Sequence, residues 1–223
     1  MKSKVLLIVP TRSRPDSSVE FYNLFIKNSH ITDLMFALDD DDEHNYPRLS
    51  KALYEINPRG RVGMNDKLNL VATKYAGEYE YIAFLGDDHR ILTDGWDKKL
   101  VESISDIDNG IAYGNDLHQK DSLPTAVLMD SNIIKVLGYM APPEQQHLYL
   151  DNFWKELGMR LNTLRYCPDV ILEHLHFSIG KSEEDNQYRE VNSGEMYEKD
   201  KASYGNYLIL QIYNDVVKLN KSI

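Results

Sequence analysis

Short, unbroken apolar runs alternate with amphipathic segments over the first hundred residues of the chain. Three runs, 4–10 (KVLLIVP), 34–38 (LMFAL) and 81–85 (YIAFL), have the aliphatic character of strands buried on both faces of a parallel sheet. Between them, residues 16–28 and 66–75 carry apolar side chains at helical spacing. This alternation predicts an α/β, Rossmann-like fold with a central, mostly parallel sheet flanked by helices.

The rest of the chain has a less regular pattern. Short strands are predicted at residues 61–62, 111–113, 125–129, 165–166 and 170–172. Further helices are predicted at residues 47–56, 130–137 and 149–157, the last ending at Gly158. The tail is expected to be helical, because its apolar residues recur about once per helical turn, at Leu208, Ile212, Val216 and Leu219.

Size and composition fit one α/β core. A chain of 223 residues with 42% hydrophobic and 27% charged residues is typical of globular proteins and short for two domains. No apolar stretch reaches the length that a membrane helix needs, and the single cysteine, Cys167, cannot form an internal disulfide. We therefore expect one domain over residues 1–223 and a cytoplasmic location. The net charge of −10 disfavours broad binding to nucleic-acid phosphates.

Two acidic clusters directly follow predicted strands. Asp39 ends the second apolar run, and Asp87 and Asp88 come just after the third. Ligands of open α/β sheets bind outside the carboxyl ends of the strands, so both clusters are expected to face one crevice. Adjacent acids repel unless a cation compensates them, and Mg²⁺ or Mn²⁺ commonly bridges such acids to phosphates. With Arg12 and Arg14 in the loop after the first run, these residues indicate a nucleoside-diphosphate site.

The order PTRSRP, FALDDDD and YIAFLGDDHR resembles the nucleotide-sugar-binding half of GT-A fold glycosyltransferases of the family-2 type. The resemblance covers about residues 1–100 and implies a nucleotide-sugar donor and a divalent cation, Mn²⁺ or Mg²⁺. It assigns Asp39 to the nucleobase, Asp88 to the metal and Asp87 to the ribose or a metal-bound water, the last two being interchangeable. Gly86, counted with the donor-binding residues, occupies the first position of the family's triple acid. The implied nucleotide loop consists of Pro10, Thr11, Arg12 and Arg14.

The resemblance extends weakly into residues 101–223, the expected acceptor half. Asp151 in YLDNFW corresponds to the carboxylate that inverting members use to deprotonate the acceptor hydroxyl, with Glu144 as the alternative. Many GT-A enzymes complete the metal shell with a late histidine. His176 is the first choice here and His174 the second, because residues two apart in an extended segment face the same side.

Other residues fall near these motifs. Lys181, in Gly-Lys-Ser, resembles the segment that closes over the diphosphate, where it would offset leaving-group charge. Asp66 and Lys67 open a helix and are expected to contact the nucleotide, although helix capping explains Asp66 equally well. The acids at 40–43 are expected to form a solvated turn. Trp96 is expected in the core or as a pocket wall that stacks on the acceptor.

The sequence thus predicts a metal-dependent, inverting glycosyltransferase that moves a sugar from a nucleotide-sugar, preferably a UDP-sugar, to an acceptor hydroxyl. A glycan and a modified DNA base are both candidate acceptors, because the short chain resembles small transferases encoded by bacteriophages. Two alternatives stay open. A nucleotidyltransferase shares the acids at the strand ends but usually has a Gly-rich loop near its start, and PTRSRP contains no glycine. A non-catalytic protein of this fold would bind the donor and transfer nothing.

Overall fold

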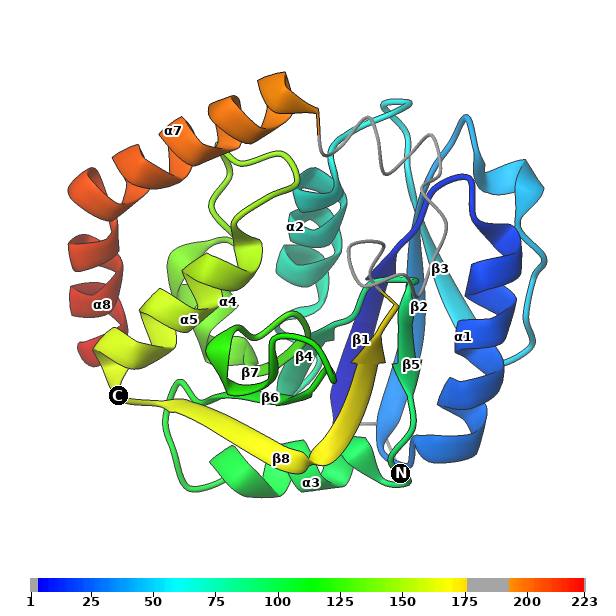
Figure 1. Cartoon of the computed structure of the whole chain (residues 1–223), viewed down its shortest axis with the longest axis horizontal. Helices are drawn as coiled ribbons and strands as arrows, with labels where there is room; N and C mark the ends of the chain where they lie inside the picture. Colours follow the sequence, from blue (N-terminus) through cyan, green and yellow to red (C-terminus); the bar gives the residue numbers. More distant parts are fainter. Residues whose placement is uncertain (1–3, 176–192, 223) are drawn as a thin grey trace.

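A curled, mostly parallel eight-stranded sheet forms the centre of the molecule, with helices on both faces (Figure 1). The computed structural model describes residues 4–175 and 193–222. The strands are β1 (Val5–Pro10), β2 (Thr32–Asp39), β3 (Ala52–Asn57), β4 (Tyr81–Phe84), β5 (His89–Ile91), β6 (Ile111–Asn115), β7 (Val127–Asp130) and β8 (Leu164–His174). Their order in the sheet is β3-β2-β1-β4-β7-β6-β8-β5. β7 runs antiparallel to both of its neighbours and β5 runs antiparallel to β8, whereas the other pairs are parallel.

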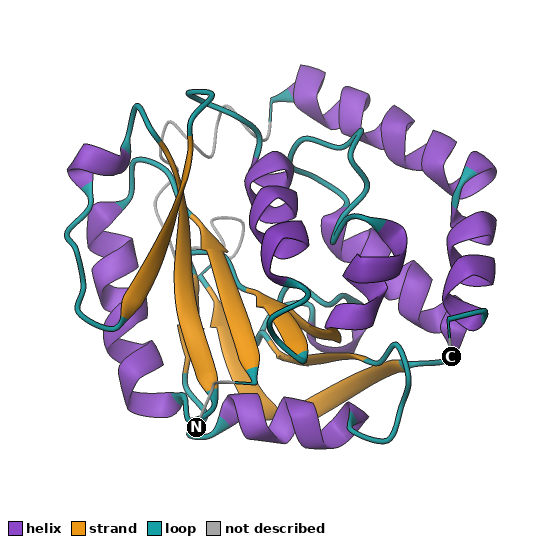
Figure 2. Cartoon of the chain, turned by 180° about the vertical axis from the view of Figure 1, so that it is seen from behind, coloured by secondary structure: helices purple, strands orange, loops and turns teal. Residues whose placement is uncertain are grey.

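Alternating residues of the buried strands supply two separate cores. Leu6 and Ile8 of β1 pack in the core that includes α2, α4, α5 and the C-terminal helices. Val5, Leu7 and Val9 pack on the other face of the sheet, against α1 and α3. Figure 2 shows these two helical layers from behind. The helices are α1 (Pro15–Asn28), α2 (Met64–Tyr75), α3 (Trp96–Ile104), α4 (Ser131–Leu137), α5 (Leu150–Leu161), α7 (Gly194–Leu210) and α8 (Ile212–Asn220), with short 3-10 turns at Glu43–Asn45 and Lys120–Ser122.

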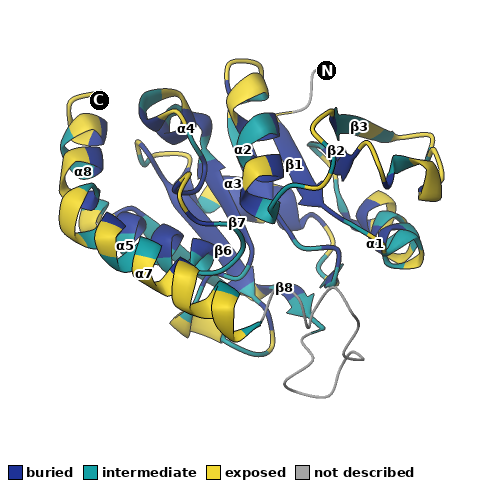
Figure 3. Cartoon of the chain, turned by 90° about the horizontal axis from the view of Figure 1, so that it is seen from above, coloured by how far each residue is buried: buried dark blue, intermediate teal, exposed yellow. Residues whose placement is uncertain are grey.

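The C-terminal helices α7 and α8 form an outer layer over α4 and α5, with their outward faces exposed (Figure 3). Ile212 and Leu219 are buried, as their helical spacing predicts. Asp215 is fully buried in this layer and accepts hydrogen bonds from the hydroxyls of Tyr139 and Tyr207. This carboxylate ties α8 to α7 and to the segment after α4. In the described residues, no helix combines the length and the apolar character that crossing a membrane requires.

The three buried strands and the helices between them agree with the sequence prediction, but the segment after β2 does not. The helix predicted over 47–56 is wrong, because strand β3 occupies residues 52–57 and pairs in parallel with β2. Tyr54 and Ile56, two residues apart in β3, both pack against the core. This two-residue period is that of a strand, so the helix expected from the apolar residues of this segment does not form. The edge strand predicted at 61–62 is also wrong, since these residues belong to the connection into α2.

Two further expectations change in the second half of the chain. The separate strands predicted at 165–166 and 170–172 are parts of one long strand, β8, whose pairing with β6 shifts register between Gly114 and Asn115. Helix α5 continues through Gly158, where a Cβ atom would lie 2.9 Å from Leu164 Cβ. Glycine at this position therefore permits close packing of α5 on β8 and does not end the helix.

Trp96 lies in the core. Its side chain is fully buried, and the indole N–H donates to Ser29 Oγ at 2.8 Å. The alternative of a pocket wall that stacks on an acceptor is therefore wrong.

Candidate active site

The carboxyl ends of β1 and β4 meet at Asp87. Thr11 Oγ1 donates to Asp87 Oδ2 at 2.6 Å, and Arg14 Nη1 donates to Asp87 Oδ1 at 3.1 Å. The Ser17 hydroxyl donates to the Asp87 carbonyl at 3.0 Å, which attaches the start of α1 to the same loop. Burial raises the pKa of Asp87 to about 6, and the neighbouring Asp88 charge adds to this, while Arg14 opposes it. The structure therefore brings the predicted nucleotide loop and the second acidic cluster together.

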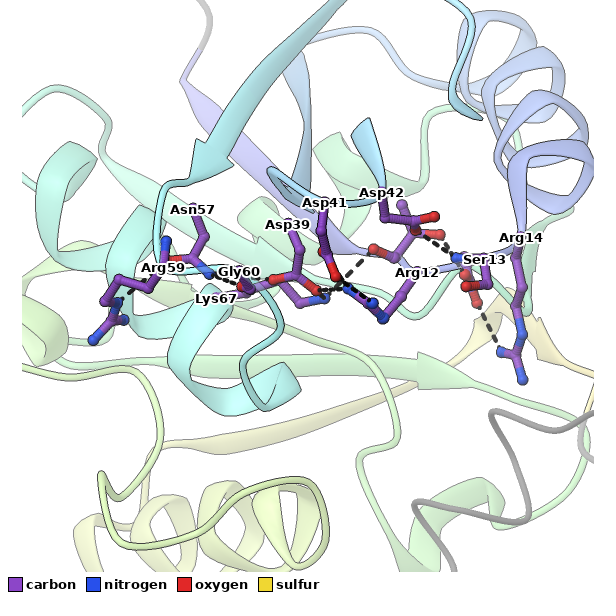
Figure 4. A network of polar contacts seen from close by, with 12 residues as sticks. Arg12, Ser13, Arg14, Asp39, Asp41, Asp42, Asn57, Arg59, Gly60 and Lys67 are labelled. Atoms are coloured by element: carbon purple, nitrogen blue, oxygen red, sulfur yellow. Dashed lines mark hydrogen bonds and ion pairs between the residues drawn. The ribbon is translucent and has the colours of Figure 1, made fainter. Parts of the chain in front are cut away.

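Asp39 is the centre of a second polar network, at the end of β2 (Figure 4). Its side chain is fully buried and accepts from Arg12 Nη1 at 2.8 Å and from Lys67 Nζ at 3.0 Å. Asn57 Nδ2, from the end of β3, also donates to Asp39 Oδ1 at 3.2 Å. Burial lowers the pKa of Lys67, although the Asp39 carboxylate opposes this shift. A buried carboxylate held by two cations and an amide is ordered before any ligand arrives.

The acidic run after Asp39 is only partly a solvated turn. Asp40 and Asp41 are exposed, and Asp41 makes a two-pronged ion pair with Arg12 at 2.8 Å for each bond. Asp42 is buried and accepts from the Ser13 backbone N–H at 2.7 Å. Ser13 has a φ of 56°, a conformation rare for residues other than glycine, and this hydrogen bond supports it. The solvated-turn expectation is thus wrong for Asp42, because a short acid beside a loop can cap the free N–H groups of that loop.

Tyr46 is a further part of this loop that the sequence analysis missed. Its hydroxyl lies 3.0 Å from Thr11 Oγ1 and accepts from the Arg14 backbone N–H at 3.1 Å. Burial raises the pKa of Tyr46 to about 12, so the hydroxyl stays protonated at neutral pH. No periodicity singles out this residue, since its position depends on the fold of the loop after β2.

Asp88 and His89, which directly follow Asp87 in the chain, form a cluster with His174. Antiparallel pairing of β5 with β8 sets His89 opposite His174, and their rings stack with centroids 4.3 Å apart. Asp88 Oδ1 lies 3.3 Å from His89 Nδ1, and Asp88 Oδ2 lies 3.4 Å from His174 Nε2. One potential ligand atom from each of the three residues lies within 4.8 Å of the other two.

Gly86 leaves room for the side chains of this cluster. A Cβ atom at position 86 would lie 2.5 Å from Asp88 Oδ1 and 3.2 Å from His89 Nδ1. The Asp88 carboxylate thus occupies the space that a side chain at position 86 would need. The Gly86 N–H also donates to His89 Nδ1 at 3.2 Å.

Asp88, His89 and His174 shift the pKa values of one another. Burial alone would raise the pKa of Asp88, but hydrogen bonds with His174 and His89 hold it well below its usual range. Burial works against the charge of His174, yet the Asp88 carboxylate raises the pKa of His174 above its usual value. The pKa of His89 is lowered, mainly by burial and also by the charge of His174. Asp88 is therefore ionised and His89 neutral at neutral pH.

The cluster fits a divalent cation. Neighbouring ligands of an ion with metal–ligand bonds of about 2.1 Å lie roughly 3 Å apart, close to the separations at Asp88. One carboxylate with imidazole nitrogens suits Mn²⁺ or another transition metal better than Mg²⁺, which prefers oxygen ligands. Asp88 and His174 were predicted as ligands, whereas His89 was missed although it directly follows the two acids.

Asp151 lies in the first turn of α5, and its charge interacts with that of His174. Burial raises the pKa of Asp151, although its own carboxylate accepts from the Asn152 N–H at 2.8 Å. Glu144, the alternative base, is exposed in the loop before this helix. Asp151 therefore has the more buried position of the two and the one nearer to the histidine cluster.

The remaining predicted residues have different outcomes. Asp66 is exposed on the first turn of α2, while Lys67 on the same turn faces Asp39. His176 and Lys181 lie outside the described residues. His147 was not predicted, but its charge interacts with those of Asp88, Arg14 and Lys67, and burial lowers its pKa to about 4.

No protein-family model matches the sequence, and no curated protein sequence does either. Solved structures do resemble it. The mannosyltransferase PcManGT from Pyrobaculum calidifontis, in complex with GDP-Man and Mn²⁺, has a TM-score of 0.60 at 11% identity, over 99% of this chain and 74% of that one. TarS from S. aureus has a TM-score of 0.56 at 14% identity over 76% of this chain, which spans only 36% of the full TarS chain. CMP:2-keto-3-deoxy-manno-octonic acid synthetase, in complex with CTP, has a TM-score of 0.54 at 11% identity, over 76% of this chain and 91% of that one.

These identities are too low to transfer an activity, but the similarity extends over most of the chain. The mixed sheet, its curl and the helices on both faces match those of GT-A glycosyltransferases. The chain therefore has a GT-A-like glycosyltransferase fold.

Proposed function

We propose that this chain is a metal-dependent glycosyltransferase that moves a sugar from a nucleotide-sugar to an acceptor hydroxyl. The observation that carries the proposal is the position of Asp88 with His89 and His174, next to Asp87 and its partners Thr11 and Arg14. A cation-binding cluster and a nucleotide loop share one crevice at the carboxyl ends of β1 and β4, where ligands of such sheets bind.

On this proposal the donor lies along the crevice, with its base near Asp39 and its diphosphate near Asp88. Because the Asp39 side chain is fully buried, it would act on the base through Arg12, which it holds and whose planar donors suit a nucleobase carbonyl. The proposed donor is a UDP-sugar. A bound Mn²⁺ would offset the negative charge that develops on the departing diphosphate. Lys181 is assigned to the same leaving group by resemblance alone.

Asp151 is the proposed general base. Its carboxylate would take the proton of the acceptor hydroxyl while the acceptor oxygen bonds to the anomeric carbon and the bond to the diphosphate breaks. A single displacement of this kind inverts the anomeric carbon. The raised pKa of Asp151, which burial causes, makes its carboxylate a stronger base than an exposed aspartate. The acidic charge of the chain favours a glycan over a modified DNA base as acceptor.

Nucleotidyl transfer is the second candidate, favoured by the likeness to the CMP:2-keto-3-deoxy-manno-octonic acid synthetase structure. Such an enzyme would join a nucleoside triphosphate to a sugar or sugar phosphate and release pyrophosphate. The acids at the strand ends serve either reaction, so the products decide between them.

The test is to incubate the protein and Mn²⁺ with a panel of nucleotide-sugars and pooled glycan acceptors, and separately with nucleoside triphosphates and sugar phosphates. The proposal predicts release of nucleoside diphosphate from one donor, faster with an acceptor and about 10²- to 10⁴-fold slower in Asp151→Asn. Pyrophosphate release from a triphosphate would instead establish the second candidate. Binding of a donor without any turnover would identify a binding protein.

A further inference from the structure

Asp200, in the middle of α7, holds three consecutive backbone N–H groups of a distant loop. Its Oδ1 accepts from the Gln146 N–H at 3.0 Å, and its Oδ2 accepts from the His147 and Leu148 N–H groups at 2.9 and 2.8 Å. The Asp200 side chain is fully buried. Burial of a carboxylate is costly unless hydrogen bonds replace its water, and these N–H groups supply them.

The other side of this loop is attached to the first turn of α2. The Asn65 backbone N–H donates to the Gln146 carbonyl at 3.1 Å, and Asn65 Nδ2 donates to the Gln145 and Pro142 carbonyls at 2.7 and 2.5 Å. A Cβ atom at Gly63 would lie 2.7 Å from the Gln146 oxygen, so glycine allows this close approach. The loop is thus held between α7 and the helix that carries Lys67, the partner of Asp39.

A second attachment to α7 involves aromatic rings. Tyr149 stacks on Tyr204 with ring centroids 5.4 Å apart and contacts Tyr197 at 5.8 Å. Tyr149 has a φ of 67°, an uncommon conformation for a bulky residue, and α5 begins directly after it. Asp151 follows in the first turn of α5, so the backbone turn at Tyr149 sets where its carboxylate lies. Contacts with α7 therefore hold the start of α5, the helix that carries Asp151.

We propose that Asp200 is a positioning residue for the active site. By fixing the loop at 145–149, it holds this loop against the first turn of α2, which carries Lys67, and it sets the start of the helix that carries Asp151. This inference rests on the proposed glycosyl transfer. It makes α7 part of the active-site framework, although α7 itself supplies no group to the reaction. A carboxylate displaced by about 1 Å from its reactive position can reduce turnover by roughly 100-fold.

The test compares Asp200→Asn with Asp215→Asn. Both aspartates are fully buried and hydrogen-bonded, but the hydrogen-bond partners described for Asp215 are Tyr139, Tyr207 and Gln211, none of which belongs to the loop at 145–149. Well below the melting temperature of each variant, Asp200→Asn should lower kcat about 10- to 100-fold with little change in the donor KM. Asp215→Asn should retain the wild-type kcat. A wild-type kcat in Asp200→Asn, or an equal loss in both variants, overturns the inference.

Two additional measurements test the inference if Asp200→Asn does not fold or if the wild type transfers no sugar. If Asp200→Asn does not fold, Tyr204→Leu removes the ring contact, and an unchanged kcat in that variant contradicts the inference. Hydrogen exchange separates the inference from the proposed function, because it needs no substrate. Asp200→Asn should speed exchange of the Gln146, His147 and Leu148 amides while leaving β4 protected, and Asp215→Asn should leave these amides unchanged. Unchanged exchange in Asp200→Asn overturns the inference even if the wild type transfers no sugar.

Discussion

His174 Nε2 lies 3.4 Å from Asp88 Oδ2, although the two residues come from opposite halves of the chain. The contact exists because β5 follows Asp88 immediately and pairs antiparallel with the end of β8. The Leu175 N–H also donates to the Asp88 carbonyl at 3.0 Å. Both the backbone and the side chain of Asp88 therefore contact the end of β8 or the residue after it. The second half of the chain thus completes the cluster that begins with Asp88 and His89 in the first half.

Gly86→Ala should impair metal binding more than folding. The new Cβ atom would lie 2.5 Å from Asp88 Oδ1, the end of a side chain that can rotate, so the carboxylate would move while the backbone stays. We expect at least about a tenfold rise in the Mn²⁺ dissociation constant, equal to roughly 1.4 kcal/mol, by isothermal titration calorimetry. Gly77→Ala is the matched control, because nothing lies within 4 Å of a Cβ atom there. Equal Mn²⁺ affinity in the two variants would refute the placement of the ion at Asp88.

Asp151→Asn should strongly reduce transfer without loss of stability at neutral pH. Loss of a general base typically lowers kcat about 10²- to 10⁴-fold. Because burial raises the pKa of Asp151 on folding, its stabilising contribution is complete below the pKa of the unfolded chain and is lost as pH rises through the folded value. An uncharged asparagine avoids that loss, so the variant should melt at the same temperature as the wild type or higher.

The raised pKa of Asp151 also determines the direction in which turnover changes with pH. The base acts only when ionised, so wild-type kcat should fall as pH falls, with a midpoint above the usual aspartate pKa of about 4. Steady-state kinetics across acid pH measures this midpoint. An acid limb that persists unchanged in the residual activity of Asp151→Asn would assign the titration to another group.

Lys67→Met should destabilise the protein and weaken donor binding. Lys67 and Asp39 are both buried, and removal of one partner leaves the Asp39 charge with Arg12 and Asn57. Breaking a buried ion pair costs about 3–5 kcal/mol, and the remaining partners place this case at the low end. Lys74→Met removes an exposed lysine paired with Glu55 and should cost at most about 1 kcal/mol. Urea denaturation compares the two, and equal losses would contradict the account of the Asp39 network.

The positions at strand ends were accessible from the sequence, because buried parallel strands have an unmistakable apolar pattern. Asp39, Asp87 and Asp88 each follow such a run and lie at the edge of the sheet where ligands bind. Strand β3 was predicted as a helix, because an edge strand with polar residues has a weak period. His89 could have been considered as a ligand, since it directly follows the acids.

Contacts between distant segments could not be read from local pattern. The partnership of His89 with His174 depends on the pairing of β5 with β8, which involves only three residues of each strand. Asp200 in α7 has the sequence surroundings of a solvated helical residue, yet it is fully buried against the loop that carries His147. Such roles depend on tertiary contacts, which leave no local pattern in a single sequence.

The central claim is tested most directly by measuring metal-dependent donor binding through thermal melting. The wild type, Asp88→Ala and Asp94→Ala are melted with nucleotide-sugars in the presence and absence of Mn²⁺. Asp94 is an exposed acid paired with His30 and serves as the control. One nucleotide-sugar should raise the melting temperature only with Mn²⁺, by the equivalent of about 2.7 kcal/mol at 100 times its dissociation constant. The increase should persist in Asp94→Ala and vanish in Asp88→Ala. An increase that needs no Mn²⁺ or survives in Asp88→Ala, or one seen only with nucleoside triphosphates, would contradict the proposed function.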